Sequence, residues 1–172
     1  MPRLTILAMF LLSACSSGSS KIDSESDLAR YPRSVFEEQG LHSRYSNATS
    51  LDYTTKHGTQ VEYTSSDGRA FLWYPGNSRL VIGRWRTETD KHGSGRICFK
   101  YPSSSYNPVT QTYGGSWSCV RAADYIWGEE EYARGDPLNL SSRNMPFVMP
   151  REKKLTFSKI GKIAGVGINP SL

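Results

Sequence analysis

The chain has 172 residues, of which 37% are hydrophobic and 12% aromatic. This composition supplies enough apolar side chains for the core of one domain, and the length argues against two domains. The 21 basic and 16 acidic residues leave a formal net charge of only +5, a modest surplus that by itself indicates no anionic partner. Beyond residue 12 no segment is long and apolar enough to cross a membrane, which excludes a further transmembrane helix.

The first residues have the pattern of an export signal. Arg3 supplies a positive charge, and Leu4 to Leu12 form an apolar run. This run is too short for a permanent membrane span, which takes roughly 20 residues. Two small residues and then a cysteine follow, and Leu12-Ser13-Ala14-Cys15 resembles the lipobox of bacterial lipoproteins.

The lipobox implies that residues 1–14 are a signal peptide and that Cys15 becomes lipidated, so that the membrane is a partner through this anchor. One acyl chain holds a protein only marginally, whereas two or three anchor it stably. Ser16, where inner-membrane lipoproteins of enterobacteria carry aspartate, implies a place in the outer membrane, facing the periplasm. An ordinary secretory signal or a cytosolic protein with an apolar N-terminus is the alternative.

Composition divides the rest of the chain into two parts. Residues 15–27 are rich in serine and nearly free of apolar side chains, so we expect a flexible tether. Residues 28–172 are expected to form a single β-rich domain. At its start, residues 28–41 predict a short N-terminal helix that ends at Gly40, and Pro32 limits where this helix begins.

From residue 58 to residue 120 short β-branched and aromatic segments alternate with turn signals. Ser65-Ser66-Asp67-Gly68 predicts a hairpin turn between the segments 59–64 and 69–74. A longer segment, 79–87, has the two-residue alternation of a strand. The pattern predicts a mainly β fold, a single small antiparallel barrel or sandwich whose edges are closed or covered.

Cys98 and Cys119 remain as an even pair once the first cysteine is lipidated. Disulfides persist in exported proteins, and both residues lie in segments with strand character. A disulfide here closes a loop of about 20 residues and stabilises the fold by roughly 3 kcal/mol in the chain-entropy description. A metal pair or a redox-active pair is the alternative, but the chain has neither a Cys-x-x-Cys spacing nor a histidine cluster to support it.

The predictions beyond residue 120 are less regular. Residues 124–132 fit a strand followed by a turn or a short helix, and the run Glu129-Glu130-Glu131 is typical of a solvated face. Two prolines interrupt residues 145–157. Residues 159–168 contain many glycines, so we expect the last 15 or so residues to form an edge strand or a loose tail.

Four segments in the middle of the chain together resemble uncharacterised small exported proteins of alphaproteobacteria, described only as domains of unknown function. They are residues 67–77, 83–86, 97–101 and 117–119. The resemblance covers about residues 58–122. It implies a β-rich exported domain with one disulfide and carries no catalytic residue.

No segment has a pattern that predicts catalysis or metal binding. His42, His57 and His92 are dispersed, and no Gly-x-Ser-x-Gly elbow occurs. The run 129–131 offers carboxylates for glycan cleavage, which requires a pair about 5 to 9.5 Å apart, but acidic runs are more often solvated. We therefore predict no catalytic residue, no metal site and no cofactor.

The polar loop 101–115 is the best candidate for a binding surface. Tyr101, Tyr106 and Tyr113 offer flat apolar faces and hydroxyl groups, which suit sugars or a protein partner. Alternatively, these tyrosines only cover the end of the barrel. Arg84 and Arg86 lie on a neighbouring strand, where they could face an anionic glycan or lipid or form an ordinary solvated face.

Together, these patterns predict a cell-envelope lipoprotein that acts as a non-enzymatic structural or binding component at the outer membrane. Peptidoglycan and an envelope protein are the candidate partners, and nucleic acid is not expected for an exported lipoprotein. A small envelope hydrolase acting on peptidoglycan or lipid is the alternative.

Overall fold

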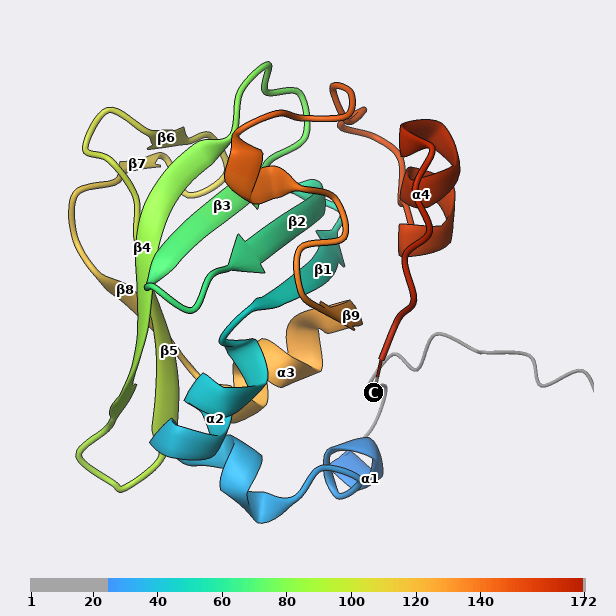
Figure 1. The fold of residues 1–172 in the computed structure, drawn as a ribbon. Coiled ribbons are helices and arrows are strands. Elements are labelled where there is room, and N and C mark those ends of the chain that lie inside the picture. The colour runs from blue at the N-terminus through green and yellow to red at the C-terminus, as the bar shows by residue number, and fades with distance from the viewer. Residues whose placement is uncertain (1–24, 172) are drawn as a thin grey trace, which may run out of the picture.

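The computed structural model describes residues 25–171 (Figure 1). The predicted signal peptide, Cys15 and most of the predicted tether lie outside the described residues.

Seven strands of the described chain form one antiparallel sheet in the order β8-β5-β4-β3-β2-β1-β9. Their bounds are β1 Ala48–Thr54, β2 Gly58–Thr64, β3 Arg69–Trp73, β4 Val81–Thr89, β5 Gly95–Lys100, β8 Ser118–Arg121 and β9 Glu129–Arg134. The sheet curves into a half-barrel that is open between β8 and β9 (Figure 1). Helix α3, Ala122–Gly128, connects these two edge strands directly. The predicted mainly β antiparallel fold is therefore confirmed.

Between β5 and β8 the chain forms a long loop with a small two-stranded ribbon. The ribbon pairs β6, Tyr106–Asn107, with β7, Thr112–Tyr113. The hairpin turn predicted at residues 65–68 joins β2 and β3, and Gly68 adopts a φ of 80°, which an L side chain rarely allows. Strand β1 was not predicted from the sequence.

The two faces of the sheet pack against different segments of the chain, and each face has its own set of side chains because these alternate along every strand. One face carries Ala70, Trp85, Ile97 and Phe99 and packs against α2, Glu38–Tyr45, and against α3. The other face carries Leu51, Val61, Phe71 and Trp73 and packs against the C-terminal segment. The fold thus has two hydrophobic clusters with the sheet between them.

The N-terminal region contains three short pieces instead of one helix over residues 28–41. These are α1, Glu25–Leu28, the 3₁₀ helix η1, Arg33–Phe36, and α2. Gly40 lies inside α2 and does not end it, so the predicted helix end was wrong. A Cβ atom at Gly40 would lie 2.0 Å from the carbonyl oxygen of Ser34, so glycine is needed there for close packing against η1.

The C-terminal segment contains the 3₁₀ helix η2, Leu140–Ser142, and an α-helix, α4, Phe157–Ala164. The expectation of an edge strand or a loose tail was therefore wrong for α4. The hydroxyl of Thr156 accepts a hydrogen bond from the backbone N–H of Lys159 and caps the helix at its start. Phe157 and Ile160 are fully buried on the face that α4 turns to the sheet.

The three glutamates of β9 are buried, not solvated. Glu129 pairs with Arg44 of α2 at 2.6 Å, and Glu130 pairs with Lys154 at 2.6 Å. Glu131 accepts a hydrogen bond from the backbone N–H of Phe157. The acidic run therefore ties both ends of the described chain to the sheet.

Candidate functional site

A cavity of about 750 Å³ lies between the half-barrel sheet and residues 105–116 of the long loop. This volume is within the range of small-molecule sites, roughly 300 to 1,000 Å³. Strands β1 to β5 contribute Asp52, Gln60, Glu62, Leu72, Val81 and Phe99, helix α3 contributes Tyr125, and the ribbon contributes Tyr106 and Tyr113.

The strand register explains why these side chains share one face. Asp52 pairs directly with Gln60 across β1 and β2, and Glu62 pairs with Leu72 across β2 and β3. Leu72 in turn pairs with Val81 of β4. Directly paired residues of antiparallel strands project from the same face, so all five point into the cavity.

Asp52 and Glu62 are the two carboxyl groups of the cavity. They are diagonal neighbours across β1 and β2, a position that places the two residues roughly 7–8 Å apart, with their Cβ atoms somewhat closer. The Gln60 side-chain amide donates to Asp52 Oδ2 at 2.9 Å, and the Tyr101 hydroxyl donates to Glu62 Oε1. Burial raises the pKa of Asp52 to about 7 and that of Glu62 to about 8, although these hydrogen bonds favour the charged forms.

No described basic residue forms a salt bridge with either carboxyl group. The nearby charges act in the opposite sense, since Glu129 and Glu130 of β9 raise the pKa of Asp52 further. Arg151 lines the cavity, but its guanidinium packs on the turn at Gly76, where it lowers the pKa of Tyr74 against the effect of burial. Among the described residues the acidic pair therefore has no ion-pair partner.

Aromatic rings form the wall beside the two carboxyl groups. Phe99 stacks on Tyr101 with an interplanar angle of 2°, and its ring centroid lies 5.8 Å from that of Tyr125. Burial raises the pKa of both tyrosines well above the usual value, so their hydroxyl groups stay neutral at physiological pH.

The three tyrosines proposed from the sequence all line this cavity. Tyr101 lies in the wall, while Tyr106 and Tyr113 form the rim, 51% and 70% exposed, with their ring centroids 5.1 Å apart. The ribbon pairs these two directly, and so the loop presents them side by side.

The two arginines proposed from the sequence lie elsewhere. Arg84 and Arg86 are exposed on the opposite face of β4 from Val81, as the alternation along this strand requires. The guanidinium of Arg86 lies 4.4 Å from the ring centroid of Trp117. The structure therefore separates the proposed arginines from the proposed tyrosines.

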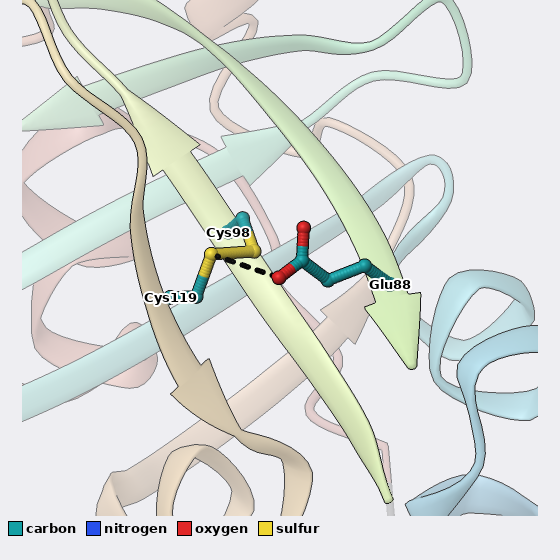
Figure 2. A group of neighbouring side chains, drawn as sticks. All are labelled: Glu88, Cys98 and Cys119. Carbon is teal, nitrogen blue, oxygen red and sulfur yellow. Dashed lines mark hydrogen bonds between the residues drawn. A yellow bond between two sulfur atoms is a disulfide. The ribbon is translucent and has the colours of Figure 1, made fainter. Parts of the chain in front are cut away.

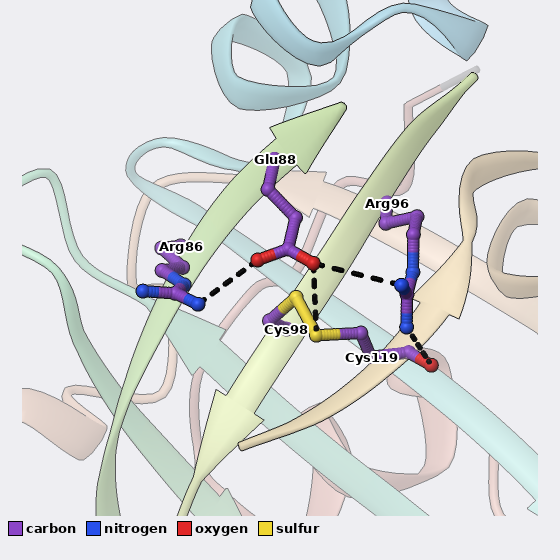
Figure 3. Close-up of a disulfide and its surroundings, with 5 residues drawn as sticks. All are labelled: Arg86, Glu88, Arg96, Cys98 and Cys119. Atoms are coloured by element: carbon purple, nitrogen blue, oxygen red, sulfur yellow. Dashed lines mark hydrogen bonds and ion pairs between the residues drawn. A yellow bond between two sulfur atoms is a disulfide. The ribbon is translucent and has the colours of Figure 1, made fainter. Parts of the chain in front are cut away.

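Cys98 and Cys119 form the predicted disulfide, directly across β5 and β8 (Figure 2). Glu88 of β4 points toward it, with a carboxylate oxygen 3.6 Å from Cys119 Sγ. Arg86 and Arg96 flank Glu88 and pair with it at 2.9 and 3.6 Å (Figure 3). Within residues 25–171 this is a group of potential metal ligands, but both sulfurs are bonded to each other, so only the carboxylate is free to coordinate.

Asp52 and Glu62 were missed in the sequence because no catalytic or metal-binding motif includes them. One signal was available for Glu62, which stands at an alternating position of the predicted strand 59–64. A carboxyl group facing inward from a strand is unusual and indicates a site. Nothing in the sequence pairs it with Asp52, since β1 itself was not predicted.

Within the described part of the chain, no helix combines the length and the apolar character needed to cross a bilayer. No protein-family model, no curated protein and no solved structure matches this chain.

Proposed function

We propose that the protein is a cell-envelope lipoprotein, anchored through Cys15 at the outer membrane, that binds peptidoglycan without cleaving it. The observation that supports binding is the cavity, whose wall combines aromatic rings with hydrogen-bonding side chains and whose rim carries two exposed tyrosines. Tyrosine rings suit stacking against sugar rings, and the polar groups beneath them can hydrogen-bond hydroxyl and amide groups. The N-terminal lipobox supports the location.

Co-sedimentation with purified peptidoglycan sacculi tests this proposal. The full-length protein, solubilised in detergent, is mixed with sacculi at low and high salt. We expect binding that survives high salt, because stacking and hydrogen bonds are screened less than surface charge pairs. The variant Tyr106→Ala/Tyr113→Ala should lose most of this binding, since it removes the aromatic rim.

Trp127→Ala provides the matched control. Trp127 is an exposed aromatic residue of α3 that does not line the cavity, so its removal should leave binding unchanged. Equal binding by the tyrosine variant and the control, or no binding by the unaltered protein, would contradict the proposal.

The acidic pair favours one other candidate, a small envelope hydrolase. The diagonal placement of Asp52 and Glu62 is compatible with the 5 to 9.5 Å between the carboxyl groups of glycoside hydrolases. Release of soluble fragments from sacculi, lost in Asp52→Asn and retained in Glu88→Gln, would favour this function over simple binding. Glu88 is suitable as the control because it lies outside the cavity.

A further inference from the structure

The cavity holds two carboxyl groups, and within residues 25–171 no group of opposite charge forms an ion pair with them. Glu62 is only 9% exposed, and its carboxyl group accepts a hydrogen bond from a neutral phenol, Tyr101. Asp52 likewise has a neutral partner, the amide of Gln60. A buried carboxyl group either stays protonated through a raised pKa or is ionised beside a cation or a metal ion. No described side chain forms an ion pair with them, so a ligand that carries a positive charge would stabilise their ionised forms.

The surrounding wall suits an organic cation. Phe99, Tyr101 and Tyr125 line the cavity beside the carboxyl groups, and aromatic faces attract ammonium groups through their negative π surface. The same faces also accept the apolar part of a ligand.

A metal ion fits the pair less well. Among the described residues, the group of three potential ligands that converge within 4.8 Å is Glu88, Cys98 and Cys119, and neither Asp52 nor Glu62 belongs to it. A divalent ion needs several oxygen ligands around one point, whereas Asp52 and Glu62 belong to no such converging group within residues 25–171.

We propose that the ligand of this cavity presents a positively charged amino group to Asp52 and Glu62 and lays its apolar part against Phe99, Tyr101 and Tyr125. The inference rests on the proposed function only in requiring that the cavity binds a ligand. Peptidoglycan offers both of the required chemical groups, sugar rings for the tyrosines of the rim and amino groups on its peptides. The chemistry that defines the site is the amine, whatever molecule carries it.

Binding of a cation has a distinctive pH dependence here. Without ligand the two carboxyl groups hold protons up to pH 7 and 8, and a cation binds to them only after those protons leave. The affinity of the cavity for a ligand that stays positively charged over this range should therefore rise from pH 6 to pH 8.5. The other titratable and charged groups around the pair are Glu129 and Glu130 of β9, Tyr125 of α3, Tyr101, Tyr74 with its hydrogen-bonded His57, and Arg151.

Titration of the full-length protein in detergent with n-butylamine and with butan-1-ol tests the proposal. The amine keeps its charge at both pH values, because alkylammonium groups such as that of lysine titrate near pH 10.4. The NMR signal of the Gln60 side-chain amide reports binding at the site, since this group hydrogen-bonds Asp52. With a pKa near 7, Asp52 is about one-tenth ionised at pH 6, and Glu62 ionises in the same interval, so we expect at least about ten-fold tighter amine binding at pH 8.5.

Isosteric variants identify the groups responsible. Asp52→Asn and Glu62→Gln keep the oxygen that accepts each hydrogen bond, and should weaken amine binding at pH 8.5 and flatten its pH dependence. Glu88→Gln, which removes an acid outside the cavity, should behave like the unaltered protein. The spectra of the unliganded variants show whether each one is folded.

The proposal is overturned if butan-1-ol binds as tightly as the amine at pH 8.5, if amine affinity falls as the pH rises, or if neither probe moves the Gln60 signal. The outcome of the sacculus experiment does not depend on these results. Tyrosine-dependent sedimentation without amine preference keeps the proposed function and removes this inference, whereas amine binding without sedimentation does the reverse.

Discussion

Asp52 and Glu62 keep their protons to unusually high pH because burial disfavours their charged forms. In an unfolded chain both groups would titrate near their ordinary values. Between about pH 4 and pH 8 the folded state therefore binds more protons than the unfolded state, and the free energy of unfolding falls as the pH rises through this window. The site thus lowers the stability of the fold at neutral pH, as functional sites often do.

Replacing either carboxyl group with its amide should remove this effect. Asp52→Asn and Glu62→Gln are expected to be more stable than the unaltered protein at pH 8, by up to about 4 kcal/mol each, since one pKa unit corresponds to 1.36 kcal/mol. Near pH 4 the difference should vanish. Urea unfolding at the two pH values measures it, and a difference in the free energy of unfolding that is the same at pH 4 and pH 8 would contradict the raised pKa values.

Arg44 is a second residue whose charge is buried. It pairs with Glu129 and lies 4.1 Å from the ring centroid of Tyr132, while the Tyr45 hydroxyl donates to the same carboxylate at 2.8 Å. Arg44→Met should cost about 3–5 kcal/mol in urea unfolding, because it leaves Glu129 buried without its cation. Adding Glu129→Gln should restore part of the loss. An effect no larger than that of Arg84→Met, at an exposed position, would contradict this role.

The same residues show where sequence reasoning fails at this scale. Glu129 has a partner 85 positions earlier in the chain, and Glu130 has one 24 positions later. Composition within a short window indicates a solvated run, since the basic partners are outside the window. The tyrosines of the loop were found because they are clustered in sequence, whereas Asp52 and Glu62 meet only through strand pairing.

At the scale of elements, the disulfide fastens β8, an edge strand, to β5 and closes the loop that carries the ribbon. Cys98→Ser/Cys119→Ser should lower the free energy of unfolding by roughly 3 kcal/mol, because the 21-residue separation no longer constrains the unfolded chain. Urea unfolding of the variant measures this loss. Addition of a reductant should reproduce it in the unaltered protein and have no effect on the variant.

Helix α4 is an element whose burial can be tested directly. Phe157→Ala should destabilise the protein by about 3–5 kcal/mol, since the ring is fully buried against the sheet. Ile163→Ala, in the same helix, should change stability by less than about 0.5 kcal/mol because Ile163 is 60% exposed. Thermal unfolding compares the two, and similar losses would mean that the helix does not dock as described.

Elements with regular alternation were predictable, and those held by tertiary contacts were not. Residues 79–87 alternate plainly and contain most of β4. Strand β1 mixes threonine, serine and aspartate with few large apolar residues, so its pattern is weak although its pairing with β2 and β9 buries it. Helix α4 contains Gly161, which disfavours a helix by propensity, but the Thr156 cap and the burial of Phe157 outweigh that cost.

At the scale of the whole molecule, the two faces of the sheet differ in how completely they are covered. The face that packs against the C-terminal segment is a closed hydrophobic cluster, whereas the other face is covered by α2 and α3 over one part and left hollow over the rest. Because β8 and β9 are not paired with each other, the half-barrel stays open, and the loop within the disulfide forms the outer wall of the hollow. The cavity therefore forms only when the sheet and the loop within the disulfide are both in place.

The membrane location is tested at the same scale. Cys15→Ser should move the protein from the membrane fraction to the soluble fraction, because each buried methylene of an acyl chain contributes about 0.8 kcal/mol to membrane binding and the thiol is the proposed point of attachment. Fractionation of cells that express each form, followed by immunoblotting, measures the change. Cys98→Ser/Cys119→Ser is the matched control, since it removes two cysteines and leaves the lipobox intact. Membrane retention of Cys15→Ser at the level of this control would mean that something other than a lipid on Cys15 holds the protein.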